Sequence, residues 1–275
     1  YVCKHLKYNT QLSYERVIRL HVKPALGKYR LVSLEPDILQ KWIDEKKMEG
    51  YSKSMVKNIF TCLQGALAYA VHPCKYIPGN PCLYVKIPKM EVPEASKAHT
   101  EYICIPEDYK NIMQRFPKGN VFYLPLLTGY HCGTRISETY GIDLANDVDF
   151  ETHTLHIRHQ LTKERGAWFY RLPKYDSVRS LRMDPVFEAA LKEEISTLSV
   201  RESGELMTAE SFKYCARVVH YELENPLFHY HSLRHTHGTI LAENGAQPKT
   251  VMERLGHKDL KTTMEKYVFN TDKMK

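Results

Sequence analysis

Apolar residues recur at the spacing of an α-helix through the first third of the chain. The clearest repeat lies in residues 52–70, where the apolar positions three and four residues apart are Met55, Ile59, Leu63, Leu67 and Ala70. This stripe predicts a helix that begins after Ser52 and ends before Pro73.

Two shorter helices are predicted before it. One covers residues 36–49, with Pro36 in the first turn, where a proline is well tolerated. The other covers residues 9–21, and its expected apolar face consists of Leu12, Val17 and Leu20. The first third of the chain is therefore predicted to form a small helical bundle.

The second part of the chain mixes two periodicities. Helical spacing is found first, over residues 107–116, 121–132 and 135–141. Alternating, β-prone sequence follows, over residues 154–159, 168–172 and 178–183, and turns are predicted at 163–166 and 173–177. Helical spacing then resumes. The predicted fold class is mainly α with a small three-stranded antiparallel sheet.

A proline-rich, aperiodic stretch at residues 76–98 separates the two parts and is the best linker candidate. The chain has 275 residues, which is long for one domain. We therefore expect a helical domain over residues 1–90, a linker over 91–103 and a second domain over 104–275.

Positive charge is concentrated in the first domain. The chain carries a net charge of +7, but residues 1–90 hold 15 basic and 6 acidic side chains, and the remainder is close to neutral. Such a basic module suggests a polyanionic partner, although lysines on helices can also serve solubility alone. The DNA-contacting lysines that we expect are Lys53, Lys57, Lys86 and Lys89.

Cysteine usage and hydropathy indicate the cellular compartment. The seven cysteines form no Cys-x-x-Cys pair, and we interpret them as reduced, mostly buried thiols. No apolar run reaches the ~20 residues of a membrane span, and no leader peptide opens the chain. A cytoplasmic protein is expected.

Two short motifs place cationic groups at helical spacing. In Cys132-Gly-Thr-Arg135-Ile-Ser-Glu138 an arginine precedes a glutamate by one turn, which alone would suggest an intrahelical ion pair. In His231-Ser-Leu-Arg234-His235, an imidazole and a guanidinium share a helix face, which suits a phosphate oxygen. A surface cluster is the alternative. No metal is expected, because there is no His-Glu-x-x-His motif.

Two further motifs stand out less on their own. Lys174 lies in the turn after the second predicted strand. Lys163, in the preceding turn, is the alternative candidate for a functional lysine in this region. Leu255-Gly-His257 is followed ten residues later by Tyr267. Turn lysines are usually solvated, and most of the 19 tyrosines must serve packing.

Together, in chain order, these motifs closely resemble those of the tyrosine recombinases, or phage-type integrases. The sequences around Arg135 and Lys174 are most similar to integrases of conjugative transposons. Residues 21–27 and the helix before Gly79-Asn-Pro-Cys resemble the core-binding domain of the family. The resemblance thus covers nearly the whole chain.

The resemblance implies a role for each matched residue in site-specific DNA cleavage and rejoining. Tyr267 would attack the phosphodiester and form a 3′-phosphotyrosine, while Arg135 and Arg234 bind the non-bridging oxygens. Lys174 would protonate the leaving 5′-oxygen. The supporting residues would be His231, for proton transfer, His257, for hydrogen bonding to phosphate, and Glu138, behind the arginines. No cofactor is implied.

The family also implies double-stranded DNA as partner, held in a C-shaped clamp by the two domains. Assembly as a dimer on each site and a tetramer in the synapse is expected in the bacterial cytoplasm at the nucleoid, with a possible accessory excision factor. Two alternatives stay open from the residues: a type IB topoisomerase, and a non-catalytic DNA-binding protein on the same scaffold.

Departures from the family pattern concern the loops and ends. Tyr175 follows Lys174 where a threonine is common, and the segment between residues 189 and 208 is short. The chain begins close to the core-binding helices, where many integrases have an arm-binding domain, and only eight residues follow Tyr267. A short C-terminal tail is therefore expected.

Overall fold

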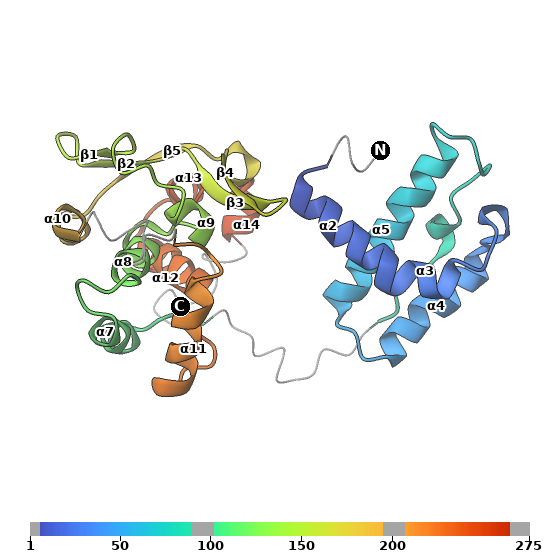
Figure 1. Ribbon diagram of the computed structural model, residues 1–275, viewed down its shortest axis with the longest axis horizontal. Coiled ribbons are helices and arrows are strands. Elements are labelled where there is room, and N and C mark those ends of the chain that lie inside the picture. Colours follow the sequence, from blue (N-terminus) through green and yellow to red (C-terminus); the bar gives the residue numbers. More distant parts are fainter. Residues whose placement is uncertain (1–5, 90–101, 195–206, 265–275) are drawn as a thin grey trace. The chain divides into compact units, whose positions relative to one another are not determined.

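The computed structural model describes residues 6–89, 102–194 and 207–264. The chain divides into two compact units, residues 1–98 and 99–275, which are described separately (Figure 1). Two helical-type units agree with the predicted fold class. The predicted linker, residues 91–103, lies largely outside the described residues, so its boundaries stay a prediction.

Unit 1 is a helical bundle around one apolar core. Its α-helices are α2 (Tyr8–Val17), α3 (Lys23–Leu26), α4 (Pro36–Met48) and α5 (Lys53–Val71). A π-helical turn, Ile18–Val22, joins α2 to α3, and 3₁₀ turns cover Leu31–Ser33 and Pro81–Tyr84.

Helix α5 confirms the strongest sequence pattern. The Ser52 Oγ accepts a hydrogen bond from the Met55 backbone N–H at 3.3 Å and so begins the helix. The predicted stripe faces the core, with Ile59, Leu63 and Leu67 buried. Burial of this stripe, rather than helix propensity, holds α5 in place.

The predicted apolar face of α2 is wrong. Leu12 and Leu20 are 43% and 46% exposed, and of the three predicted residues only Val17 is buried. Positions 12 and 17 are five residues apart, a spacing that does not return to the same helix face. The residues that face the core are instead Tyr14, Val17 and His21, spaced three and four apart.

The first half of the proline-rich stretch is part of unit 1 rather than a linker. Ile77, Cys82 and Val85 are buried in its core. The segment is also fixed to α4, because Gln40 exchanges two hydrogen bonds with the Lys86 backbone, at 2.8 and 2.9 Å. The prolines interrupt the helical periodicity of this segment, but its apolar side chains still pack in the core of unit 1.

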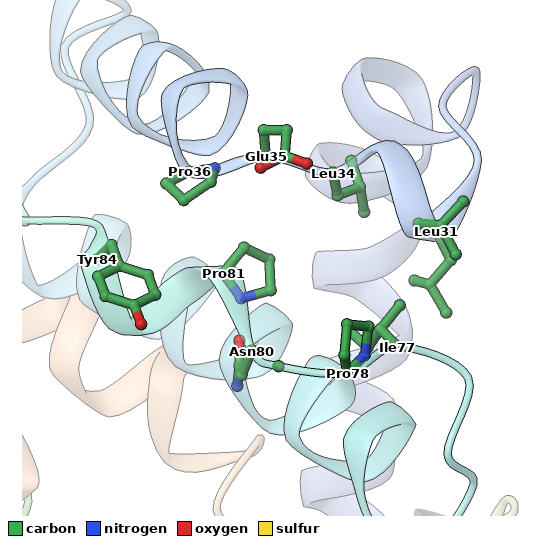
Figure 2. Close-up of a pocket in the computed structure, with 11 residues that line it drawn as sticks. Leu31, Leu34, Glu35, Pro36, Ile77, Pro78, Asn80, Pro81 and Tyr84 are labelled. Atoms are coloured by element: carbon green, nitrogen blue, oxygen red, sulfur yellow. The ribbon is translucent and has the colours of Figure 1, made fainter.

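A small pocket lies between this segment and the start of α4. It has a volume of about 220 Å³ and is shown in Figure 2. Its walls are mainly apolar: among the residues that line it are Leu34, Pro36, Pro78, Pro81 and Tyr84.

Unit 2 has a helical core with strands at its edge. Its helices are α7 (Pro106–Arg115), α8 (Tyr123–Cys132), α9 (Ile136–Thr139), α10 (Pro185–Glu194), α11 (Phe212–Glu222), α12 (Tyr230–Glu243), α13 (Pro248–Leu255) and α14 (Leu260–Thr263). Helices α8 and α12 are buried on most of their faces. Gly129 permits their close approach, since a Cβ there would lie 3.0 Å from both Leu233 and Tyr230.

The strands form two small antiparallel sheets. The three-stranded sheet has the order β1 (Val148–Asp149), β2 (Thr154–Ile157) and β5 (Arg179–Arg182). Strands β3 (Gln160–Glu164) and β4 (Ala167–Arg171) form a separate hairpin.

The predicted sheet is therefore present with a different membership. The middle predicted strand, β4, pairs with β3 instead, so that β2 and β5 pair directly and β1 adds to the other edge of β2. Lys163, placed in a turn by the sequence pattern, is a strand residue paired with Trp168. Residue alternation identifies strands but not their partners, which explains the error.

Cysteine state and helix hydropathy can be described over the same ranges. Of the seven cysteines, the six that the structure describes are free, and five of them are buried: Cys62, Cys82, Cys104, Cys132 and Cys215. Across the described ranges, none of the helices combines the length and apolarity needed to cross a bilayer.

Candidate active site

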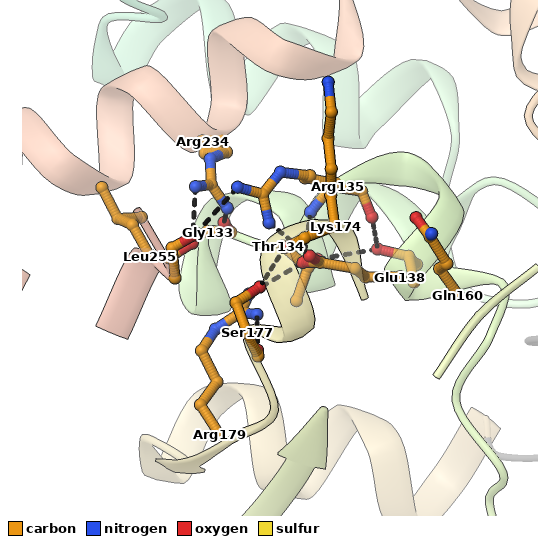
Figure 3. Close-up of polar contacts among 12 residues, drawn as sticks. Gly133, Thr134, Arg135, Glu138, Gln160, Lys174, Ser177, Arg179, Arg234 and Leu255 are labelled. Atoms are coloured by element: carbon orange, nitrogen blue, oxygen red, sulfur yellow. Dashed lines mark hydrogen bonds and ion pairs between the residues drawn. The ribbon is translucent and has the colours of Figure 1, made fainter. Parts of the chain in front are cut away.

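Three arginines from three different segments converge on the C-terminal end of α13 (Figure 3). Each donates to one of three consecutive backbone carbonyls: Arg179 Nε to Arg254 at 2.8 Å, Arg234 Nη2 to Leu255, and Arg135 Nη2 to Gly256 at 2.9 Å. The last carbonyls of a helix have no intrahelical partner and form the negative end of its dipole. The C-terminal end of α13 therefore binds three positively charged guanidinium groups.

Glu138 is the carboxylate at the centre of this cluster, and its side chain is 0% exposed. One oxygen accepts from Arg135 Nη1 at 2.5 Å, and the other from Arg179 Nη2 at 2.8 Å. Burial by itself would raise the pKa of Glu138, but Arg179, Arg135 and Arg234 outweigh it and hold the pKa at about 2. Glu138 is thus ionised and holds two guanidinium groups.

Local backbone chemistry places Arg135 and Glu138 together. Arg135 is the N-cap residue of α9, and its backbone N–H donates to Glu138 Oε2 at 3.0 Å. A glutamate at the third helical position that binds back to the cap is a capping-box interaction. The ion pair predicted from the sequence is present, but it is a buried part of the cluster.

Two left-handed glycines shape the walls of the cluster. Gly256 ends α13 with φ +64°, and a Cβ there would lie 2.9 Å from Arg179 Nη1 and 3.0 Å from Ser177 Oγ. Gly133 ends α8 with the same φ, and its carbonyl accepts from Arg234 Nη1 at 2.8 Å. At both positions conformation and space require glycine.

Helix α12 carries Arg234 on its buried side and His231 on an exposed position. The ring of His231 packs edge-on against that of His235 at a centroid distance of 4.5 Å. Tyr230, the first residue of the helix, lies with its hydroxyl 2.5 Å from Thr139 Oγ1, which fixes α12 to α9. The His231 and Arg234 pair is therefore presented by a fixed helix.

His237 further along α12 connects that helix to α13. Its Nδ1 donates to the Tyr130 carbonyl at 2.9 Å, and its Nε2 accepts from Arg254 Nε at 2.9 Å. These two partners require the neutral ring with the proton on Nδ1. Burial, with the nearby Arg254 charge, lowers the pKa of His237 to about 3.

His257 and Lys174 lie at the margin of the cluster. His257 follows Gly256 directly, and its Nδ1 is 2.8 Å from Thr263 Oγ1 on α14. Lys174 is exposed in the turn between β4 and β5, with its ammonium 5.5 Å from the centre of the Tyr175 ring. This turn is attached to the cluster, since the Ser177 carbonyl accepts from Arg179 Nη1 at 3.1 Å.

The structure thus brings together Arg135, Glu138 and Arg234, with His257 adjacent in sequence. Lys174 and His231 lie on elements fixed to this cluster. Tyr267 lies outside the described residues. In unit 1 the four lysines expected to contact DNA, Lys53, Lys57, Lys86 and Lys89, are all exposed.

Sequence reasoning missed Arg179. Its side chain is only 7% exposed and makes an ion pair with Glu138. A signal was present: residues 179 and 181 share one face of the strand, and Leu181 is buried, as is Met183 directly after the strand. An arginine in register with buried positions indicates a buried charge with a partner.

In the parts of the chain that the structure describes, no group of three or more histidine, cysteine, aspartate or glutamate side chains is arranged to hold a metal ion. The polar chemistry of this site is that of guanidinium, imidazole and carboxylate groups.

Comparisons with known proteins agree with this architecture. Residues 106–274 match the phage integrase family, and residues 1–47 match the phage integrase N-terminal SAM-like domain. Tyrosine recombinase XerC of Listeria welshimeri is 26% identical over 272 residues, covering 94% of this chain and 87% of that protein.

Solved structures share the fold. The Tn1549 transposon integrase in complex with a circular intermediate DNA superimposes with a TM-score of 0.82 at 22% identity, covering 98% of this chain and 92% of that one. A lambda integrase tetramer bound to a Holliday junction gives a TM-score of 0.70 at 16% identity, covering 99% and 74%.

Fold, site and relatives define the class as DNA strand-breaking and rejoining enzymes of the tyrosine recombinase type, which act in site-specific recombination. The chain belongs to the phage integrase family, because the match to that family extends over more than half of its length. This confirms the family resemblance of the sequence motifs.

Proposed function

We propose that this enzyme cleaves and rejoins DNA through a 3′-phosphotyrosine at Tyr267 and serves the excision and integration of a mobile element. The observation that carries the proposal is the convergence of Arg135 and Arg234 on the adjacent carbonyls of Gly256 and Leu255, one residue from His257.

The charge of the cluster supports phosphate as its ligand. Three guanidinium groups surround the Glu138 carboxylate, so positive charges exceed negative ones by two in the contacts described. Burying excess charge is costly unless an opposite charge completes the site. A phosphodiester carries one negative charge, and its pentacovalent transition state carries a second. Arg135 and Arg234 therefore stabilise the transition state more than the substrate.

The proton transfers are assigned to the residues at the margin of the cluster. As the Tyr267 oxygen bonds to phosphorus, the bond to the 5′-oxygen breaks, and Lys174 supplies the proton that this oxygen needs. His231 accepts the proton of the attacking tyrosine, and His257 donates a hydrogen bond to a phosphate oxygen. Glu138 orients Arg135 and does not react.

Rejoining is the reverse reaction with a different strand. A 5′-hydroxyl attacks the phosphotyrosine, the bond to Tyr267 breaks, and the tyrosine oxygen regains its proton. Because the covalent intermediate conserves the phosphodiester bond energy, the exchange requires no nucleotide hydrolysis.

Unit 1 supplies general contacts to the DNA backbone through its excess of lysine and arginine. We infer that Lys53, Lys57, Lys86 and Lys89 lie at phosphates, so that binding weakens with salt. We further infer a dimer on each core site and a tetramer in the synapse, as in the lambda integrase assembly on a Holliday junction, acting at the nucleoid in the bacterial cytoplasm.

Covalent trapping tests the nucleophile. The enzyme is incubated with a library of nicked duplexes whose short 5′ fragment diffuses away after cleavage, and adducts resistant to detergent are recovered and sequenced. Wild-type protein is expected to yield adducts enriched in one DNA sequence. Tyr267→Phe is expected to bind that sequence and trap none.

Tyr221→Phe is the matched control, since Tyr221 is 80% exposed on α11 and outside the cluster; it should trap DNA as the wild type does. Adducts that persist in Tyr267→Phe would contradict the assignment of the nucleophile. Adducts without sequence enrichment, together with plasmid relaxation, would indicate a topoisomerase. Tight binding with no adduct in wild type would indicate a non-catalytic DNA-binding protein.

A further inference from the structure

Arg179 connects strand β5 to three other segments of the cluster. From strand β5 its guanidinium reaches Glu138 of α9, the Arg254 carbonyl of α13 and the Ser177 carbonyl of the Lys174 turn. Its side chain is 7% exposed. Each of the three nitrogens of the guanidinium thus donates to a protein acceptor, and these contacts support a structural role for Arg179 beneath the reacting groups.

The contact with Glu138 is the one that bears on the reacting groups. Glu138 divides its two oxygens between Arg135 Nη1 and Arg179 Nη2. With one oxygen held by Arg179, Arg135 can keep its Nη2 on the Gly256 carbonyl. Without Arg179, the oxygen that it holds would keep the uncharged backbone N–H of Arg135 as a donor, and Arg135 would be the one guanidinium hydrogen-bonded to the buried carboxylate.

We propose that Arg179 is a positioning residue for DNA cleavage, which holds Glu138 and, through Glu138, sets the orientation of the Arg135 guanidinium. This inference rests on the proposed function of the same site. It assigns a task to a residue outside the six groups expected to touch the phosphate or transfer protons.

The energetic reason is the cost of an incompletely paired carboxylate. A buried carboxylate that loses a charged partner either reorients toward the remaining one or takes up a proton. Either change moves Arg135 relative to the phosphate, and displacement of a catalytic group by about 1 Å can slow a reaction about 100-fold. DNA affinity depends mainly on other contacts and should change little.

The test is single-turnover cleavage of the trapping substrate at saturating DNA. Arg179→Met is expected to cleave about 100-fold more slowly than wild type, with DNA affinity within about threefold. Arg179→Lys keeps a cation for Glu138 and should recover about tenfold of that loss. Arg182→Met, an exposed arginine on the same strand, is the matched control and should cleave normally.

A double-mutant cycle separates positioning from general structural support. If Arg179 acts through Glu138, the variant carrying both Glu138→Gln and Arg179→Met should cleave within about threefold of the slower single variant. Multiplication of the two single defects would contradict the proposal. Arg179→Gln replaces Arg179→Met if the latter does not fold.

A second substrate tests the alternative that Arg179 acts by positioning the Lys174 turn, through its contact with the Ser177 carbonyl. Replacing the bridging 5′-oxygen by sulfur gives a leaving group that needs no proton, so it should restore cleavage in Lys174→Met. It should not restore Arg179→Met. Restoration there would show that Arg179 acts on the lysine turn and would overturn the proposal, as would full-rate cleavage by Arg179→Met. Failure of wild-type protein to trap DNA would instead contradict the proposed function.

Discussion

The two units of this protein place their charges in opposite ways. Unit 1 buries an almost wholly apolar core, and the charged group buried in its described part, Lys46, pairs locally with Glu49 at 2.6 Å. Its large excess of positive charge is distributed over the surface. Unit 2 is nearly neutral in total, yet it buries Glu138 and Arg234 at 0% and 1% exposure.

Under the proposed function, this difference corresponds to two tasks that both involve phosphate. Exposed cations in high dielectric attract many DNA phosphates weakly and are screened by salt. Buried cations fixed by carbonyls and a carboxylate act on one phosphate strongly, because their orientation is set before the ligand arrives. Net charge alone would have assigned DNA contact to unit 1 and missed the charged site of unit 2.

The largest expected effect concerns a charge in the arginine cluster of unit 2. Replacing Arg135 by Met should reduce the single-turnover cleavage rate about 10³-fold, because a fixed donor to the developing phosphate charge is lost. DNA affinity should remain within about threefold. Arg115→Met, which removes an exposed arginine paired with Glu222, should leave the rate unchanged. Equal loss of rate in both variants would contradict the distinction between arginines of the cluster and exposed surface arginines.

Acid should destabilise unit 2 through His237. Its pKa is about 3 in the folded protein against an ordinary value of 6.5, so the unfolded chain binds more protons between these values. Stability is therefore complete above pH 6.5 and is lost as the pH falls toward 3, with a loss of about 2 kcal/mol from pH 7 to pH 5. Urea unfolding at both pH values measures it.

His237→Gln is the control for this effect. Glutamine keeps a donor for the Tyr130 carbonyl and an acceptor for Arg254 but does not titrate. The variant should lose about 2 kcal/mol less than wild type over the same interval. An equal acid loss in both proteins would mean that other groups govern the transition.

A matched pair of glycines separates backbone strain from crowding of the arginine cluster. Gly245 and Gly256 both have positive φ, +79° and +64°, but a Cβ at Gly245 would meet nothing within 4 Å. Gly245→Ala should cost about 1 kcal/mol of stability and leave cleavage intact. Gly256→Ala should cost about 1 kcal/mol more and slow cleavage about tenfold, since Arg179 and Ser177 must move.

Comparison of the two alanine variants by thermal unfolding and by single-turnover cleavage checks this expectation. Normal cleavage by Gly256→Ala would show that the cluster tolerates displacement of Arg179 and Ser177, and would contradict the dependence of cleavage on their exact positions.

The smallest expected effect belongs to the surface charges of unit 1. Replacing Lys53 and Lys57 together by Gln should lower DNA affinity several-fold. The slope of log affinity against log salt should become shallower by about 2, because each lost phosphate contact contributes about 0.9 to that slope. Cleavage at saturating DNA should not change. Lys213→Gln in unit 2 is the control, and an identical change of salt slope there would contradict the assignment of the backbone contacts to unit 1.

Much of the fold follows from local patterns. The stripe from Ile59 to Leu67 predicts α5 because a helix repeats every 3.6 residues, and the proline at 36 marks the start of α4 for a stereochemical reason. Local patterns fail where the choice depends on distant segments. Strand β4 pairs with β3 rather than entering the three-stranded sheet, and Leu12 is exposed because the core lies on another face of α2.

The site divides in the same manner. The sequence by itself predicted the site residues Arg135, Glu138, His231, Arg234 and the Leu-Gly-His segment, because their order and spacing resemble those of the family. Tertiary structure alone decided that Arg179 belongs with them and that the end of α13 orients the arginines. The C-terminal carbonyls of α13 and the buried Glu138 carboxylate bind donors that are close in space but distant in sequence. Residue spacing along the chain does not predict such contacts.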